Sequence, residues 1–317
     1  MGLKPSIVLK NKKGFLLTTL TLFIIFLFVL TYAILLSKRD VRSEQERVKS
    51  LNEFVFAMKQ DLPRQLNIFT FRTLFLLEKR IIDTGSYVDN MTLRFEEAFF
   101  NGTLYDEPQS ILIGASYNDI VQSLQERGEL VGLNITLSNP RVRLFQPNPW
   151  NVEFELTAQM FIEDQGGLAR WNSSVTSSGK VAIEKFDDPI YLVNTNSLIA
   201  HKFVKTPYEV FVSNGDASNL SDHLQNSYYV ESSSAPSFLD RFEGKLSNPS
   251  TLGIESLVNL EELSAQGIGV TEKSVVDYIY FSSNNPSFCA VQESGLPSWF
   301  RIDTAHTSKY QVTCVPS

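Results

Sequence analysis

Three histidines are the first candidates for chemistry in this chain of 317 residues, and they stand far apart, at His201, His223 and His306. A hydrolytic serine needs a histidine as its base and an acid that orients the ring. His306, Asp303 and one of the many serines could form such a triad, but chance alone supplies this combination in a serine-rich chain. We therefore expect the histidines to be surface or packed polar residues.

Paired carboxylates are the second candidates, because two acids that share a proton can act as acid and base. Asp187 and Asp188 are adjacent in the sequence, as are Glu261 and Glu262. Adjacent residues on a strand or helix point away from each other, so neither pair is placed to share a proton. We interpret both pairs as solvated charges.

Motifs that hold cofactors or metals are absent: the chain has no phosphate-binding loop, no Gly-x-Gly-x-x-Gly after a strand, no His-Glu-x-x-His and no Cys-x-x-Cys. Residues 214–219 are rich in oxygen ligands, as calcium loops are, but they lack the regular acidic spacing and the distant bidentate glutamate. A polar turn is the favoured interpretation. The sequence thus predicts no catalytic residue, no cofactor and no metal site, and we expect the protein not to be an enzyme.

Aromatic side chains offer one alternative, a surface that binds sugars or peptides. Tyr228 and Tyr229, Trp299 and Phe300, and the aromatics near Tyr278 are its candidates. Aromatic side chains are more often part of a core, so packing is the favoured interpretation.

Residues 15–36 form a long stretch without any charged side chain. As a helix it would be roughly 33 Å long, enough to cross a hydrocarbon core of about 30 Å. A buried core helix normally has a polar face and a secretory signal has a small-residue cleavage site, and this stretch has neither. We expect a single transmembrane helix from Phe15 to Leu36, and the partner of this helix is the lipid bilayer.

The charges around this stretch predict its orientation. Residues 1–14 form a basic leader or cytoplasmic tail with four lysines and no acid, which favours a cytoplasmic N-terminus and an extracytoplasmic remainder. The whole chain has a net charge of −7 and its first thirty-nine residues carry +6, so the remainder carries −13. An acidic domain without a basic stripe is a poor fit for a nucleic-acid-binding protein.

The two cysteines, Cys289 and Cys314, are close in sequence, and outside the cytoplasm they would most simply form a disulfide. Two free thiols or half of a metal site are the alternatives. Five acceptor sequons for N-glycosylation are compatible with an exterior location and begin at Asn90, Asn101, Asn134, Asn172 and Asn219.

Residues 37–85 are expected to form an amphipathic helical stalk that continues the transmembrane helix without a break. One helical seam is predicted by the spacing of Val41, Val48, Leu51, Val55, Met58 and Leu62. Pro63 either kinks this rod or lies in the first turn of a second helix that Asp61 caps. The apolar stretch of residues 66–82 should be buried against the globular part.

Residues 86–212 are expected to form an α+β extracytoplasmic domain. Short helices are predicted over residues 91–100 and 117–127, with Gly128 as a stop. Alternating apolar residues then predict strands over 131–137 and 152–162, with a further strand or hairpin around Ser178 and Gly179. Helices followed by strands indicate an α+β fold with a mostly antiparallel sheet.

The last third of the chain is expected to be a separate unit. Residues 213–237, rich in Ser, Asn, Asp and Gly, are predicted to be a linker or long surface loop. Residues 238–317 would then form a small domain closed by the disulfide. Within it we expect helices over 238–242 and 254–263 and a strand over 275–281.

The N-terminal region resembles the class III signal of type IV pilins and archaeal pilin-like proteins: Lys12, Lys13 and Gly14 precede the apolar run from Phe15. The resemblance implies cleavage between Gly14 and Phe15 and a helix that first anchors the protein and later packs in a filament. Bacterial pilins have glutamate at the fifth mature position, where this chain has Thr19. The resemblance covers about sixty residues.

We therefore expect a membrane-anchored, extracytoplasmic surface protein, pilin-like or minor-pilin-like, whose partners are other pilin-like or envelope proteins. The alternative is an uncut signal-anchored domain that binds glycans or envelope proteins. An envelope hydrolase with an unrecognised site is the least favoured.

Overall fold

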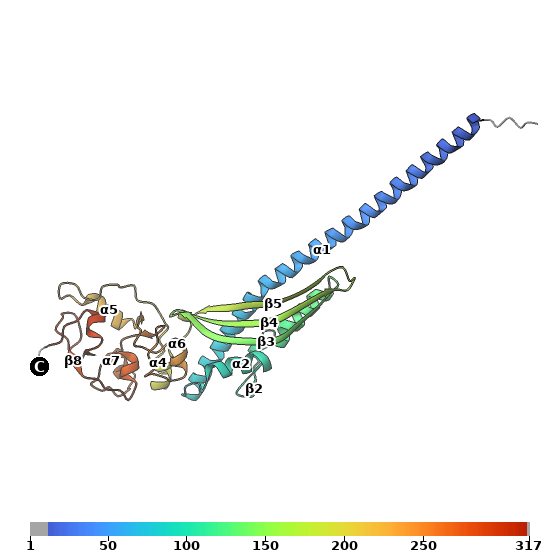
Figure 1. Ribbon diagram of the computed structural model, residues 1–317. Coiled ribbons are helices and arrows are strands. Elements are labelled where there is room, and N and C mark those ends of the chain that lie inside the picture. Colours follow the sequence, from blue (N-terminus) through green and yellow to red (C-terminus); the bar gives the residue numbers. More distant parts are fainter. Residues whose placement is uncertain (1–11, 316–317) are drawn as a thin grey trace, which may run out of the picture.

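The longest element of the computed structural model, which describes residues 12–315, is a helix of 73 residues, α1 (Lys12–Thr84). Its N-terminal half projects away from the rest of the molecule, and its C-terminal half lies against an antiparallel sheet (Figure 1). The helix continues through Pro63 without an end. Asp61 caps no second helix, since its carboxylate accepts hydrogen bonds from Arg64, Gln65 and Arg127.

The predicted seam of α1 is confirmed where its side chains are described. Leu51, Val55, Met58 and Leu62 are buried and Val48 is half-buried, whereas the side chain of Val41 lies outside the described residues. The seam continues through a second set of buried residues, Leu66, Phe69, Leu74, Leu77 and Ile81. This burial of one helix face, rather than intrinsic propensity, stabilises the C-terminal half of α1.

Three strands form the sheet in the order β3 (Leu133–Asn148), β4 (Asn151–Asp164), β5 (Arg170–Ala182), and neighbours are antiparallel. Along β4, buried residues alternate with less buried ones, as the sequence predicts for a sheet with one wet face. β5 runs straight through Ser178 and Gly179, so the hairpin considered there is wrong.

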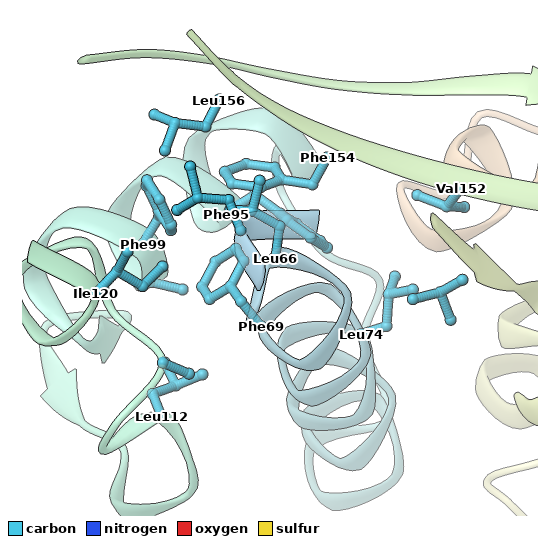
Figure 2. Close-up of a cluster of buried hydrophobic side chains, with 14 of the residues drawn as sticks. Leu66, Phe69, Leu74, Phe95, Phe99, Leu112, Ile120, Val152, Phe154 and Leu156 are labelled. Carbon is cyan, nitrogen blue, oxygen red and sulfur yellow. The ribbon is translucent and has the colours of Figure 1, made fainter. Parts of the chain in front are cut away.

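The core between sheet and helices is centred on phenylalanines (Figure 2). The Phe69 ring of α1 lies 6.0 Å from that of Phe95 and 4.9 Å from that of Phe99, both on α2 (Met91–Asn101). It also lies 4.9 Å from the ring of Phe154 on β4. Such aromatic pairs contribute about 0.5–1.5 kcal/mol each beyond area burial. α3 (Tyr117–Glu129) packs beside β3 and contains Gly128, which therefore does not end the helix.

Short elements make up most of the remaining chain. They are β1 (Thr103–Leu104), β2 (Glu107–Pro108), η1 (Ser110–Leu112), η2 (Ile183–Lys185), α4 (Pro189–Asn194), α5 (Ser218–Gln225), β6 (Val230–Glu231), α6 (Phe238–Phe242), β7 (Ile254–Glu255), α7 (Leu260–Ala265), α8 (Asp277–Tyr280), β8 (Phe288–Ala290), β9 (Arg301–Asp303) and α9 (Thr307–Tyr310). The overall fold class is α+β, as predicted.

Three predictions for the C-terminal region are wrong. Residues 213–237 are not a linker, because they contain α5 and bury Leu220, Leu224 and Tyr229. Residues 275–281 contain the helical turn α8 instead of a continuous strand. Residues on both faces of this segment are buried, so alternation could not separate inside from outside. The helix expected over 254–263 is β7 followed by α7.

The predicted disulfide between Cys289 and Cys314 is present and ties β8 to the C-terminal segment. This region is also continuous with the first core, since Phe238, Phe242 and Ile254 belong to the same buried cluster as the seam of α1.

Gly179 determines how closely β5 approaches α1. A Cβ atom there would lie 2.2 Å from the backbone nitrogen of Asn67 and 2.2 Å from the backbone carbon of Leu66. Gly179→Val adds a residue that strands favour, yet we expect it to destabilise the protein by roughly 2 to 4 kcal/mol because the helix must move. The measurement is urea unfolding of the detergent-solubilised chain.

Gly269→Val is the matched control, because no atom beyond the two neighbouring residues in the chain lies within 4 Å of a Cβ at Gly269. It should change the unfolding midpoint little. Equal midpoints for the two variants would contradict the close approach of β5 to α1.

Candidate functional site

The N-terminal half of α1 is the first candidate. Leu16–Leu36 is apolar and long enough to cross a membrane, and none of it is buried. The hydroxyls of Thr21 and Thr31 donate to the carbonyls of Leu17 and Leu27, at 2.8 and 2.7 Å, so these polar atoms are satisfied within the helix. The span therefore presents an apolar surface all round, which suits lipid or another apolar helix.

The backbone at the predicted processing site, Gly14 and Phe15, is already helical within α1. The side chains of residues 12–15, and the whole leader before Lys12, lie outside the described residues.

Polar contacts fix the exposed helix to the sheet just beyond the span. Arg47 donates to Asp164 at 2.8 Å, and the Trp171 indole donates to Asn52 at 2.8 Å. The carboxylate of Asp164 is fully buried, and the hydrogen bond from Arg47 lowers the pKa of this group. These contacts fix α1 to the sheet from Arg47 onward, and the backbone of α1 is helical from the apolar stretch to Arg47.

The second candidate is a buried polar cluster around His306, at the start of α9. Its Nδ1 lies 2.7 Å from Oδ1 of Asp303 on β9, and its Nε2 lies 3.3 Å from Oε2 of Glu255 on β7. The hydroxyl of Tyr278 is 3.1 Å from the same Nε2. The Asp303 neighbour is the one considered from the sequence, whereas Glu255 is distant in sequence and no motif identifies it.

The cluster includes an exposed serine. Oγ of Ser234 lies 3.5 Å from Nε2 of His306, which completes a serine–histidine–aspartate series with Asp303. Burial would lower the pKa of His306, but hydrogen bonds and charge from Asp303 and Glu255 outweigh burial and raise this pKa to about 9. An imidazolium cannot accept the proton of a serine, so at neutral pH the series lacks a general base.

A second buried cluster surrounds Arg241 of α6, whose guanidinium is fully buried. It contacts the carboxylates of Asp188 and Asp277 and donates to the carbonyl of Ile254. The hydroxyl of Tyr229 donates to Asp188 at 2.8 Å. The interpretation of Asp188 as a solvated charge is therefore wrong: it is a buried, paired acid. Breaking such a pair costs about 3–5 kcal/mol, which makes this cluster structural in character.

The other candidate acids and histidines are placed as the sequence suggests. Glu261 is exposed and accepts the Trp299 indole N–H at 2.9 Å, while Glu262 lies 3.1 Å from His201, so the adjacent acids point to different partners. His223 is buried, with its Nδ1 3.1 Å from the hydroxyl of Thr206.

The polar segment of residues 214–219 begins a helix. Asp216 accepts hydrogen bonds from the backbone and the hydroxyl of Ser218 at the start of α5. Among the described side chains, which are those of residues 16–36 and 44–315, no group of three or more His, Cys, Asp or Glu is placed to hold a metal ion.

Most of the candidate aromatics are core residues. Tyr229, Tyr278 and Phe300 are buried, whereas Trp299 is half-buried. Trp299 lines an open depression of about 490 Å³, whose other residues are Leu260, Glu261, Ser264, Ala265 and Val270.

The five sequon asparagines, Asn90, Asn101, Asn134, Asn172 and Asn219, are all exposed. Asn134 and Asn172 lie on strands of the sheet, and the other three lie at or within helices. Their exposure is a condition for modification.

No protein-family model matches this chain, and comparison with curated proteins and with solved structures finds no match.

The His306 cluster predicts a loss of stability in alkaline solution. Because the folded-state pKa of about 9 exceeds the ordinary value of 6.5, the contribution is complete below pH 6.5 and is lost as the pH rises through about 9. The free energy of unfolding should fall by on the order of 2 to 3 kcal/mol between pH 6.5 and 9.5. Urea unfolding across this range measures it.

His306→Gln, which cannot titrate, is the control and should remove most of this dependence. Burial lowers the pKa of His223 to about 4, which is below this range, and raises that of Glu78 to about 7. Glu78 therefore adds a smaller loss at the lower end of the range, and it does so equally in both variants. An equal loss in wild type and His306→Gln would contradict the assignment.

Proposed function

We propose that this protein is a single-pass, membrane-anchored surface protein of pilin-like type. The observation that carries the proposal is the continuity of α1: one helix is apolar on every side over Leu16–Leu36 and then buries one face against an antiparallel sheet. The first half needs an apolar environment outside the protein, and the second half supplies the domain with its core. A pilin-like subunit combines these two roles in one helix.

The bulk of the chain is proposed to lie outside the cytoplasm. Three features support this orientation: the basic residues before the span, the disulfide between Cys289 and Cys314, and the exposure of all five sequon asparagines. A disulfide persists in an oxidising compartment, and glycosylation requires accessible asparagines.

The charge on His306 supports a non-enzymatic role for its cluster. His306 is held between two carboxylates, so its ring is charged at neutral pH. The two buried clusters are best suited to specifying the packing of the C-terminal region, in which regular elements are short.

Cleavage at Gly14 tests the pilin-like part of the proposal. In a host that contains the class III signal peptidase, we expect the membrane-extracted protein to begin at Phe15, as measured by intact mass spectrometry. Gly14→Val should retain the leader because a bulky residue blocks the cut, whereas Gly2→Val is a control that should not.

An intact leader on the wild-type chain would refute processing and would favour the uncut signal-anchored alternative. That alternative receives its own support from the Trp299 depression, an open apolar surface beside an exposed acid. It would place the ligand, a glycan or an envelope protein, on the C-terminal region.

A hydrolase is the enzymatic alternative, and the geometry of Ser234, His306 and Asp303 favours it. At pH 7 we expect no labelling of Ser234 by a fluorophosphonate probe, because the protonated His306 cannot activate the hydroxyl. The measurement is gel fluorescence of wild type beside Ser234→Ala. Labelling that appears in wild type and is lost in Ser234→Ala would overturn the non-enzymatic proposal.

A further inference from the structure

The end of the sheet nearest the span carries a cluster of exposed apolar side chains, which we call the apolar tip: Leu130, Val131 and Leu168. Leu130 is 86 % exposed, more than any other large apolar side chain among the described residues. Val131 is 36 % and Leu168 is 41 % exposed. Exposed apolar side chains that gather at one place indicate an interaction surface.

Two neighbouring loops form the apolar tip. Leu130 and Val131 follow the last residue of α3, and Leu168 lies in the turn between β4 and β5. The backbone N–H of Gln165 donates to the carbonyl of Gly132 at 2.8 Å, and Leu133 pairs with Asp164 across the sheet. The loops are therefore held side by side rather than free to separate.

The position of the tip along α1 is set by Arg47, which donates to Asp164 at the base of the β4–β5 turn. Arg47 follows the end of the span, Leu36, by eleven residues, or about 16 Å along the helix. In Figure 1 this end of the sheet points in the direction in which α1 projects, and the C-terminal region lies at the opposite end.

We propose that the apolar tip inserts into the headgroup layer of the bilayer that α1 crosses, so that the span and the tip hold the domain at two points. The proposal rests on the membrane anchorage proposed above. The headgroup layer extends about 5–8 Å beyond the hydrocarbon core. The apolar tip lies about 10 Å to the side of the helix, which is a usual packing distance between layers. It comes closer to the membrane when the helix tilts toward the side on which the sheet lies.

A tilt of about 35° brings a point 16 Å along the helix and 10 Å to its side to about 7 Å above the hydrocarbon core, and transmembrane helices tilt by up to about 40°. The headgroup layer is thus within reach on the side where the sheet lies. Interfacial contacts of this kind are among the factors that set helix tilt.

The charges around the tip favour a neutral lipid surface. Arg47 is paired with Asp164, and Arg170 is paired with Glu163. Glu129, directly before Leu130, is exposed and acidic. Apolar burial, rather than attraction to anionic headgroups, is therefore the driving force, and phosphatidylcholine is a suitable lipid.

Single nitroxide labels on the full chain test the proposal. Cys289 and Cys314 are joined in the disulfide, so an introduced cysteine is the sole free thiol. The variants are Leu130→Cys, Leu168→Cys, Ile113→Cys and Val29→Cys, reconstituted at high lipid-to-protein ratio in phosphatidylcholine vesicles. Ile113 is the matched control, because it is 75 % exposed but lies beside Arg72, far along α1 from the span.

Collision with oxygen and with a water-soluble nickel complex gives the depth of each label. We expect the labels at 130 and 168 to collide several-fold less often with nickel than the label at 113, and to report headgroup depth. Leu130→Asp should return the label at 168 to water. The label at 29 should report the hydrocarbon core.

Labels at 130 and 168 that match the label at 113, with the label at 29 in lipid, would overturn the tip proposal and leave the anchor intact. Labels that are immobilised but shielded from both reagents would also overturn it, in favour of a second copy of the chain. A label at 29 in water would refute the anchor itself, and the tip proposal with it.

Discussion

The packing of α1 against the three-stranded sheet is the interaction on which the rest of the structure depends. Isolated helices gain little stability in water, and none of the stretch Leu16–Leu36 in the N-terminal half of α1 is buried. The C-terminal half is stabilised by burying one face, which runs from Leu51 to Ile81. One helix therefore meets two environments, and the sequence changes its pattern where the environment changes.

Close approach makes this packing specific. Gly179 lets the backbone of β5 come within contact of α1 near Leu66, and the Phe69 ring then reaches Phe154 on the next strand. A larger residue at 179 would separate the two layers and leave the aromatic contacts unmade. Burial also explains how the helix continues through Pro63. A proline inside a helix removes one hydrogen bond and crowds the preceding turn, at a cost of about 3 kcal/mol, and burial of Leu62 and Leu66 on either side offsets that cost.

Much of the N-terminal half could be predicted from the sequence because each element there has one buried face and one face exposed to solvent. The seam of α1 and the alternation of β4 follow directly from this difference between the faces. In the C-terminal region the asymmetry is lost. Both faces of the segment around Asp277 are buried, so period-two alternation predicted a strand where a helical turn forms.

Buried charges could not be predicted for a different reason. Asp188 pairs with Arg241 and His306 pairs with Glu255, and in each case the partners are about fifty residues apart. A charged side chain is usually exposed, so the residue type alone predicts an exposed position. Only the folded structure shows the partner that allows the charge to be buried. The sequence did suggest the local pair of Asp303 and His306, because those residues are three apart.

The link between helix and sheet has a consequence for the whole domain. Because Arg47, Asn52 and the buried seam fix the sheet to α1, the domain cannot reorient without the span also tilting or α1 bending between Leu36 and Arg47. The tilt of one transmembrane helix would therefore decide which residues of the domain approach the membrane and which point outward. With the proposed anchor, the C-terminal region, which lies at the far end of the sheet from the apolar tip (Figure 1), would be the part of the domain most distant from the lipid.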